Sequence, residues 1–176
     1  GIANTCLAAQ GFDVGSSLYE KDMLRQALEL ANKKGVILPK KVVVARSPEE
    51  EGRIVDVDSI KSSDSIFDIA PESFDAVKSI LLNAKVILWN GPVGLFENPQ
   101  FMHGTFCVVN MIVNSDAYSV GGGGDTIAAA KEIGVLDDID YMSTAGGAFL
   151  EFIEGRPLPS IEALELKALE SQDNRA

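Results

Sequence analysis

The sequence predicts an α/β fold built on a doubly wound, mainly parallel β-sheet. Two observations lead to this class. Short apolar runs typical of strands alternate with apolar-periodic segments typical of helices, and three successive strand-to-helix turns are rich in glycine. We interpret the apolar strands as buried on both faces, as strands of parallel sheets are. The expected architecture is a Rossmann-like three-layer type, in which ligands bind at the carboxyl ends of the strands.

The first third of the chain predicts two helices and two short strands. Residues 2–10 form the first expected helix, and a capping box from Ser17 to Glu20 opens the second, which ends near Gly35. Strands are expected at 36–38 and 42–45, separated by Pro39. The segment 46–65 is charged and rich in serine, and we interpret it as a solvated loop or hairpin.

In the remainder of the chain, expected strands alternate regularly with expected helices. A strand is expected at 66–69, followed by a helix that begins at Pro71. The all-apolar run 86–89 predicts the next strand, and Asn98-Pro99 is expected to open the helix after it. Two further strands are expected at 118–120 and 141–143, and each leads through glycines into a helix. The final helix is expected at about 161–169.

Composition limits the function classes. The 176 residues, of which 46% are hydrophobic, describe an ordinary soluble globular domain. The net charge of −11 argues against a nucleic acid or an anionic membrane as partner. The longest apolar run, near 106–113, is interrupted by Asn110 and is too short to span a bilayer, so no membrane segment is expected. We interpret Cys6 and Cys107 as reduced, buried thiols. Reduced cysteines are usual in proteins of the cytoplasm, so we expect that location.

The glycine-rich turns at 90–97, 121–126 and 144–147 are expected to meet along one edge of the sheet. Glycines allow close backbone approach, and the free N–H groups at a helix start bind phosphate. Asp125 follows four glycines and could hold Mg²⁺ while the metal bridges phosphates; the alternative is a tight turn with Asp125 as the N-cap. No Lys-Ser/Thr pair follows these glycines, which excludes a P-loop. The three turns together predict a phosphate or nucleotide site.

Several specific strings carry a resemblance to the phosphoglycerate kinase family. The first is Trp89-Asn90-Gly91-Pro92-Val93-Gly94-Leu95-Phe96-Glu97. The others are Gly122-Gly123-Gly124-Asp125-Thr126, Ser143-Thr144 with Gly146-Gly147-Ala148, Leu150-Glu151 through Glu154-Gly155, and Leu158-Pro159. Together with Gly1 and Ala3-Asn4-Thr5, they extend the resemblance over nearly the whole chain.

The resemblance implies a reaction and a domain organisation. The family transfers a phosphoryl group reversibly between 1,3-bisphosphoglycerate and MgADP, giving 3-phosphoglycerate and MgATP, in a monomeric enzyme of two domains. Residues 1–176 would be most of the C-terminal, nucleotide-binding domain. The acceptor-substrate domain and the first strands of the sheet would precede Gly1, as would the phosphate-binding lysine. We therefore expect a truncated chain that supplies the nucleotide and Mg²⁺ site and is inactive alone.

The resemblance also implies roles for individual residues. Asp125 would bind Mg²⁺, and Gly146 and Gly147 would face the phosphoryl group during transfer, as catalytic residues. The expected nucleotide contacts fall into four groups. Gly123, Gly124 and Thr126 would donate to the phosphates, the last through its hydroxyl, and Asn90 and Glu97 would contact phosphate and ribose. Pro92 and Leu95 would lie beside the base or sugar, and Gly1 and Leu18 would line the adenine slot. Gly122 and Phe67 are further expected residues of the nucleotide site.

Some residues depart from the family pattern. Ile66 stands where the family usually has a glycine at the wall of the adenine slot, and Ala145 replaces the first glycine of its motif. Pro48 stands where an aromatic often covers the base, and Lys41 replaces an acid. We expect Ile66 to narrow the slot. Lone His103 is interpreted as a surface residue.

Two alternative readings remain open at this stage. One is a ribokinase-like sugar kinase, in which a Gly-Asp helix start forms an anion hole and Asp125 acts as a general base. The other is a degenerate, non-catalytic nucleotide-binding module, suggested by Ile66 and Ala145.

Overall fold

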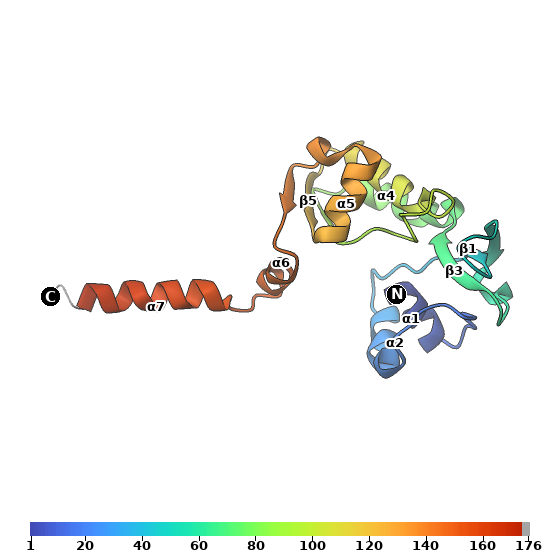
Figure 1. Ribbon diagram of the computed structural model, residues 1–176, viewed down its shortest axis with the longest axis horizontal. Helices are drawn as coiled ribbons and strands as arrows, with labels where there is room; N and C mark the ends of the chain where they lie inside the picture. The colour runs from blue at the N-terminus through green and yellow to red at the C-terminus, as the bar shows by residue number, and fades with distance from the viewer. Residues whose placement is uncertain (174–176) are drawn as a thin grey trace.

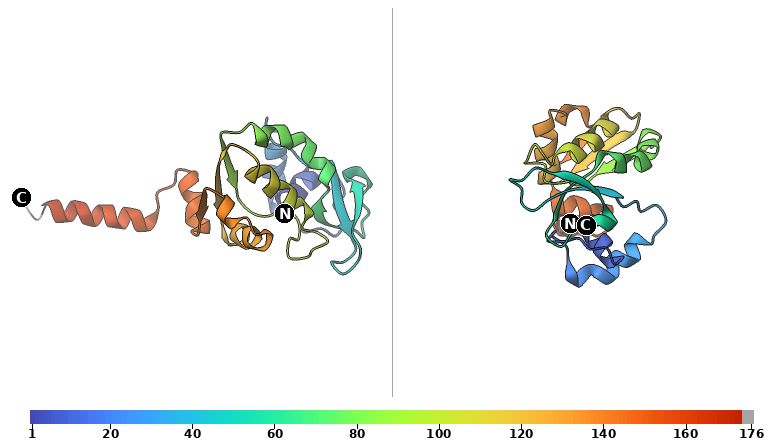
Figure 2. Two further views of the ribbon diagram at one scale, coloured as in Figure 1. Left: turned by 90° about the horizontal axis from the view of Figure 1, so that it is seen from above. Right: turned by 90° about the vertical axis from the view of Figure 1, so that its right-hand side faces the viewer.

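The computed structural model describes residues 1–173, with side chains through residue 168. It has the predicted mixed α/β class, but its strands form two separate three-stranded sheets rather than one (Figure 1). One sheet is antiparallel and the other is parallel. The N-terminal helices α1 (Ile2–Ala9) and α2 (Leu24–Ala31) lie beside the antiparallel sheet (Figures 1 and 2). The last helix, α7 (Pro159–Asp173), projects away from the rest of the protein (Figures 1 and 2).

The parallel sheet forms as the sequence predicts. Its strand order is β4-β5-β6, and the pairs Val86↔Tyr118 and Gly122↔Ser143 fix the register. Three helices cover one face, where an apolar core brings Trp89 from β4 together with Val109 and Ala129 from two of the helices. The elements are β4 (Val86–Trp89), β5 (Tyr118–Gly122), β6 (Tyr141–Ser143), α3 (Asp75–Leu82), α4 (His103–Val113) and α5 (Gly124–Ile133).

The opposite face of the parallel sheet is open, which contradicts the interpretation that these strands are buried on both faces. Along β4, Val86 and Leu88 are 64% and 48% exposed, alternating with buried Ile87 and Trp89. Tyr118, which begins β5, is also exposed. The apolar run in β4 is therefore continuous in sequence but one-sided in its packing, because successive side chains point to opposite faces of a strand.

The antiparallel sheet has the strand order β2-β1-β3. Its central strand β1 (Lys41–Ala45) pairs with β2 (Arg53–Asp56) and with β3 (Ser65–Ile69). The segment 46–65 thus contains a hairpin strand. Of the two interpretations given for it, a solvated loop or a hairpin, the hairpin is confirmed. Val42 and Val44 pack with Ile60 in a small core. The buried Asp64 carboxylate pairs with Arg53 at 2.6 Å and closes the β2–β3 connection.

Two predictions for the N-terminal region were wrong. Ser17 opens no helix: its hydroxyl donates to the Val14 carbonyl and accepts from the Ile66 N–H, so a bond to a residue 49 positions away replaces the expected cap. Residues 36–38 form no regular strand. The helix expected at residues 2–10 forms as α1 (Ile2–Ala9), and it is followed by the 3₁₀ helix η1 (Lys21–Met23) and by α2 (Leu24–Ala31).

The helix expected from Asn98 begins at His103 instead. The Asn98 side chain accepts from the Gln100 N–H and donates to the Pro48 carbonyl, so it builds a turn that docks on the loop after β1. His103, the first residue of α4, is exposed as expected. Three further 3₁₀ turns complete this part of the chain: η2 (Val57–Ser59), η3 (Pro71–Phe74) and η4 (Leu136–Asp138).

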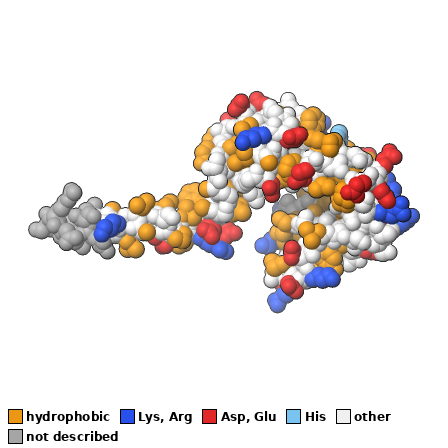
Figure 3. Space-filling view, in the orientation of Figure 1, with side chains coloured by type: hydrophobic (Ala, Val, Ile, Leu, Met, Phe, Trp, Pro, Cys, Tyr) orange, Lys and Arg blue, Asp and Glu red, His pale blue; other side chains and the backbone are white. Residues whose placement is uncertain are grey.

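The chain ends in α6 (Gly146–Ile153) and α7 (Pro159–Asp173). Leu164 and Leu166 of α7 are 71% and 63% exposed, and Figure 3 shows hydrophobic side chains along this helix. Within residues 1–173, no helix combines the length and the apolar character that crossing a membrane requires.

Candidate functional site

The three glycine-rich turns meet at the carboxyl ends of the parallel strands, as predicted. A Cβ atom added to Gly146 would lie 3.5 Å from the Cα atom of Gly123, so the turns after β5 and β6 are in contact. A Cβ atom added to Gly123 would lie 3.8 Å from the Asn90 Oδ1 atom, at the end of β4. Asn90, Gly123 and Gly146 therefore gather at one edge of the sheet.

The turn before α5 presents free polar groups. Gly123 is the N-cap residue, with a φ of 95° that favours glycine, and no side chain caps the helix. The alternative in which Asp125 is the N-cap is therefore wrong. Within the described part of the chain, the exposed Asp125 carboxylate has no hydrogen-bond or ion-pair partner. A carboxylate thus stands free beside the uncapped N–H groups of a helix start, which attract anions.

The start of α6 has the same character. Ala145 is its N-cap residue and makes no side-chain capping bond, and Gly146 and Gly147 form the first turn. Space around Gly147 is open, since no atom lies within 4 Å of where its Cβ would be. Two uncapped helix starts therefore lie side by side, and their N–H groups could serve a single anionic ligand.

The Thr126 hydroxyl makes two hydrogen bonds within the fold. Its hydroxyl donates to the Gly122 carbonyl at 2.6 Å and accepts from the Gly91 N–H at 2.7 Å, and the residue is only 1% exposed. A hydroxyl has one hydrogen to donate, and here a carbonyl takes it. Donation from this hydroxyl to a phosphate would require that bond to break, so Thr126 acts in this structure as a clamp between two turns.

The segment after β4 is held by alternate backbone N–H groups. The N–H of Gly91 donates to Thr126 Oγ1, that of Val93 to Thr105 Oγ1 at 2.9 Å, and that of Leu95 to the Phe67 carbonyl at 2.8 Å. These partners belong to α5, α4 and β3 respectively. We call residues 90–95, which belong to the first of the three glycine-rich turns, the bridging loop. It joins the other two, which we call the glycine turns, to the antiparallel sheet.

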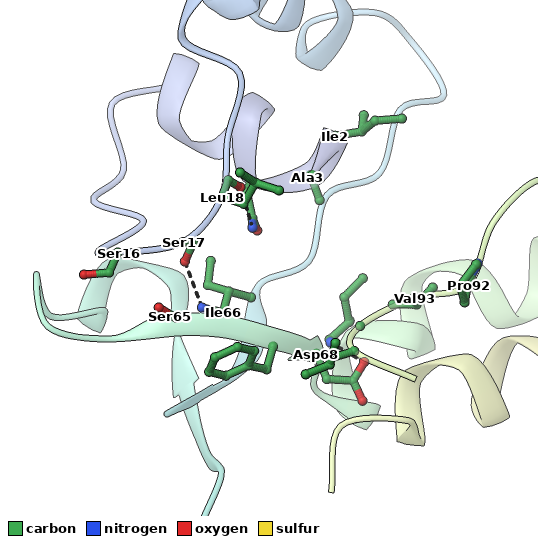
Figure 4. A pocket seen from close by; sticks show the side chains of 16 residues that line it. Ile2, Ala3, Ser16, Ser17, Leu18, Ser65, Ile66, Asp68, Pro92 and Val93 are labelled. Carbon is green, nitrogen blue, oxygen red and sulfur yellow. Dashed lines mark hydrogen bonds between the residues drawn. The ribbon is translucent and has the colours of Figure 1, made fainter. Parts of the chain in front are cut away.

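A cavity of about 530 Å³ opens between α1, β3 and the bridging loop (Figure 4). Five of the predicted nucleotide-site residues line it: Gly1, Leu18, Phe67, Pro92 and Leu95. Ile66 lines it as well, on the same strand as Phe67. The sequence motifs thus converge on two adjacent features, this cavity and the glycine turns, with the bridging loop between them.

Phe67 lines the cavity but also packs on the core, and Glu97 lies outside the cavity wall. The Phe67 ring lies 4.9 Å from that of Phe101, a fully buried residue, so its side chain serves the core. Glu97 is exposed and does not line the cavity, although it follows the bridging loop closely. Asn90 lies at the glycine turns and not in the cavity wall.

Asp68 is a residue that the sequence reasoning missed. It is 1% exposed, and its carboxylate accepts from the N–H groups of Ile69 and Gly104, each at 2.8 Å. Burial raises its pKa to about 6, despite the opposing effect of these hydrogen bonds. It also lies 2.5 Å from where a Cβ of Gly94 would be, so it fixes the bridging loop against β3 and α4. An acidic residue inside an otherwise apolar strand was the available signal.

Comparison with known proteins identifies the family. The family model of phosphoglycerate kinase matches residues 1–156. The chain belongs to the phosphoglycerate kinase family. The phosphoglycerate kinase of Haemophilus influenzae (strain PittGG) is 48% identical over 170 residues, which cover 96% of this chain and 44% of that protein. The phosphoglycerate kinase of Psychrobacter cryohalolentis is 47% identical over 180 residues, with coverages of 96% and 45%. The chain spans less than half the length of these phosphoglycerate kinases.

Solved phosphoglycerate kinases share the fold. The structure from Coxiella burnetii superimposes with a TM-score of 0.85 at 43% sequence identity, covering 92% of this chain and 44% of that one. The enzyme from Pyrococcus horikoshii OT3 gives a TM-score of 0.77 at 32% identity, covering 93% and 43%. The two-sheet arrangement described above thus agrees with solved structures of phosphoglycerate kinases.

Proposed function

We propose that this chain supplies the nucleotide and Mg²⁺ site of a phosphoglycerate kinase. The reaction is the reversible transfer of a phosphoryl group between 1,3-bisphosphoglycerate and MgADP, giving 3-phosphoglycerate and MgATP. One observation carries the proposal: the cavity and the glycine turns are linked by a single loop, which is hydrogen-bonded to Thr126 at one end and to Phe67 at the other. A nucleoside diphosphate has a matching form, with a flat aromatic base at one end and phosphates at the other.

The proposed orientation of the nucleotide follows from the chemistry of the two features. The base occupies the cavity, where the aliphatic side chains of Leu18, Ile66 and Leu95 contribute to the walls. The phosphates reach the uncapped starts of α5 and α6, whose N–H groups stabilise negative charge. In this orientation Gly146 and Gly147 face the phosphoryl group that is transferred, and their missing side chains leave room for it.

Asp125 is the residue that would hold Mg²⁺. Its exposed carboxylate is a hard oxygen ligand beside the proposed phosphate site, which suits this ion. Across residues 1–173, no three His, Cys, Asp or Glu side chains cluster as a metal site would require. An ion bound by Asp125 would therefore take further ligands from the phosphate oxygens of the nucleotide. The metal, when bound, would neutralise phosphate charge during transfer.

The rest of the proposal concerns the whole protein. Residues 1–176 would be most of a C-terminal, nucleotide-binding domain, and the triose phosphate would bind to a second domain that this chain does not contain. The chain's coverage of less than half of its relatives supports this division. We propose that the complete enzyme is monomeric and cytoplasmic, and that this chain alone has no turnover.

Calorimetric titration of the full-length protein with ADP, with and without Mg²⁺, tests the proposed site. The Asp125→Asn variant should weaken MgADP binding by about tenfold or more, while metal-free ADP binds as before. A ribokinase-like role for Asp125 as a general base predicts unchanged MgADP affinity with lost turnover. Absence of any heat in the full-length protein would instead favour a degenerate module.

A further inference from the structure

We propose that Ile66 determines which nucleotide bases the cavity accepts, by forming a rigid wall that excludes bases with bulky substituents. The inference rests on the proposed function, because it assigns the cavity to the base of a nucleoside diphosphate. It concerns the Ile66 side chain, which is one of the residues that line the cavity.

The first step is the direction of the Ile66 side chain. Ile66 lies on β3, and Figure 4 shows it pointing from the strand toward Leu18, on the opposite wall of the cavity. The Ile66 N–H donates to Ser17 Oγ at 2.8 Å, which holds this wall next to the chain segment that carries Leu18. Successive residues of a strand point to opposite faces, so Phe67 turns its ring to Phe101 while Ile66 faces the cavity.

The second step is the rigidity of this wall. Ile66 packs against the small core formed by Val42, Val44 and Ile60, two of which are at most 1% exposed. A β-branched side chain has few rotamers, and this core lies behind it. Ile66 therefore cannot turn aside to admit a larger base. Leu18 differs, since it is 79% exposed and free to adapt.

The third step is that several polar side chains at this end of the cavity already make hydrogen bonds within the fold. The Asn4 amide donates to the Leu18 carbonyl, the Ser16 hydroxyl to that of Ser62, and the Ser17 hydroxyl to that of Val14. Of the neutral polar side chains that line the cavity, Ser65 alone has no hydrogen bond within the described residues. The hydroxyl hydrogens of Ser16 and Ser17 are therefore already in use, and the rigid Ile66 side chain adds a selection among bases by shape.

Binding of ADP and of three analogues to the full-length protein tests the inference. The analogues carry a benzyl group at N6, C2 or C8 of the adenine ring, so that each edge of the base is examined. The wild-type protein should bind at least one analogue about tenfold more weakly than ADP or worse. The Ile66→Ala and Ile66→Gly variants should bring that analogue to within about threefold of ADP.

Two control variants separate the wall from the core behind it. Ile66→Val keeps the branched wall and should retain the wild-type discrimination. Val57→Ala removes a side chain that packs on the same core but does not line the cavity, so it should lower stability without altering discrimination. If Ile66→Gly fails to fold, Ile66→Ala decides the question.

The failure of the inference can be distinguished from that of the proposed function. If ADP binds but the ratio of analogue to ADP affinity is the same in wild type and in Ile66→Ala for all three analogues, the inference is overturned and the proposed function stands. If neither protein binds ADP, the proposed function is overturned, and the inference with it.

Discussion

The Thr126 hydroxyl accepts a hydrogen bond from the Gly91 N–H at 2.7 Å, which joins the first turn of α5 to the loop that follows β4. The same hydroxyl donates to the Gly122 carbonyl at the end of β5. One buried oxygen thus holds together two turns that lie 35 residues apart in sequence. The proposed phosphate site depends on this bond, because its geometry requires both turns to stay in place.

Replacing Thr126 by valine should lower stability by about 1 to 3 kcal/mol, because the Gly91 N–H and the Gly122 carbonyl both lose a partner while shape is preserved. Urea unfolding followed by circular dichroism measures this loss. Thr126→Ser keeps the hydroxyl and should retain most of the stability. Equal stability of the valine variant and the wild type would contradict the role of a clamp.

Gly94→Ala should destabilise the protein by more than backbone strain alone. Gly94 has a φ of 72°, and an added Cβ would lie 2.5 Å from Asp68 Oδ1 and from the Phe101 carbonyl oxygen. The matched control is Gly35→Ala, with a φ of 95° but no atom within 4 Å of the added Cβ. The control should cost about 1 to 2 kcal/mol through strain, and Gly94→Ala clearly more. Equal losses in thermal or urea unfolding would argue against the tight packing of the bridging loop on Asp68.

The buried carboxyl of Asp68 should lower stability as the pH rises. Burial raises its pKa from 3.8 to about 6 in the folded state, so between these values the folded protein binds the proton more readily than the unfolded chain. Its contribution is fully present below pH 3.8 and is lost as the pH passes 6, by an amount on the order of 3 kcal/mol. NMR titration of the Asp68 carboxyl carbon in the folded protein checks the pKa directly.

The stability difference between wild type and Asp68→Asn isolates this effect from other carboxyls. That difference should fall from pH 4 to pH 7. Asp140 acts in the opposite direction: hydrogen bonds from the Ser119 N–H and hydroxyl lower its pKa, so its contribution is lost as the pH falls. Exposed Asp116→Asn serves as a neutral control. A difference that is constant over this range would refute the assignment to Asp68.

Phe67→Leu should affect stability more than nucleotide affinity. The Phe67 and Phe101 rings lie 4.9 Å apart at an interplanar angle of 31°, and such pairs contribute about 0.5 to 1.5 kcal/mol beyond their burial. We expect a loss of about 1 to 2 kcal/mol in unfolding free energy, with MgADP affinity within about threefold of wild type. A large loss of affinity at unchanged stability would show that the ring contacts the nucleotide after all.

The parallel sheet could be predicted from sequence because its signals are local. The all-apolar strand β4 leads into Asn90 and Gly91, β5 ends in Gly122, and β6 ends in Ser143. The crossover rule for parallel strands brings these ends together. The convergence of Asn90, Gly123 and Gly146 follows from this rule without knowledge of any side-chain contact.

The antiparallel sheet and the hydrogen bonds of the Ser17 and Thr126 hydroxyls could not be predicted in this way, because they depend on partners distant in sequence. Ser17 has the local pattern of a helix cap, but its hydroxyl bonds the N–H of Ile66. The hydroxyl of Thr126 looks free in the motif and is occupied in the fold. A pattern shows which groups a residue carries, whereas the fold decides which of those groups are already in use.

The bridging loop has no regular secondary structure, yet its alternate N–H groups at Gly91, Val93 and Leu95 are bonded to three different elements. Their amide protons should therefore exchange with solvent slowly, as those of a sheet interior do, while exposed amides of neighbouring turns exchange fast. Because the three bonds belong to α5, α4 and β3, opening any one of these elements would release its own proton. Hydrogen exchange in this short segment thus reports separately on the stability of each wall of the site.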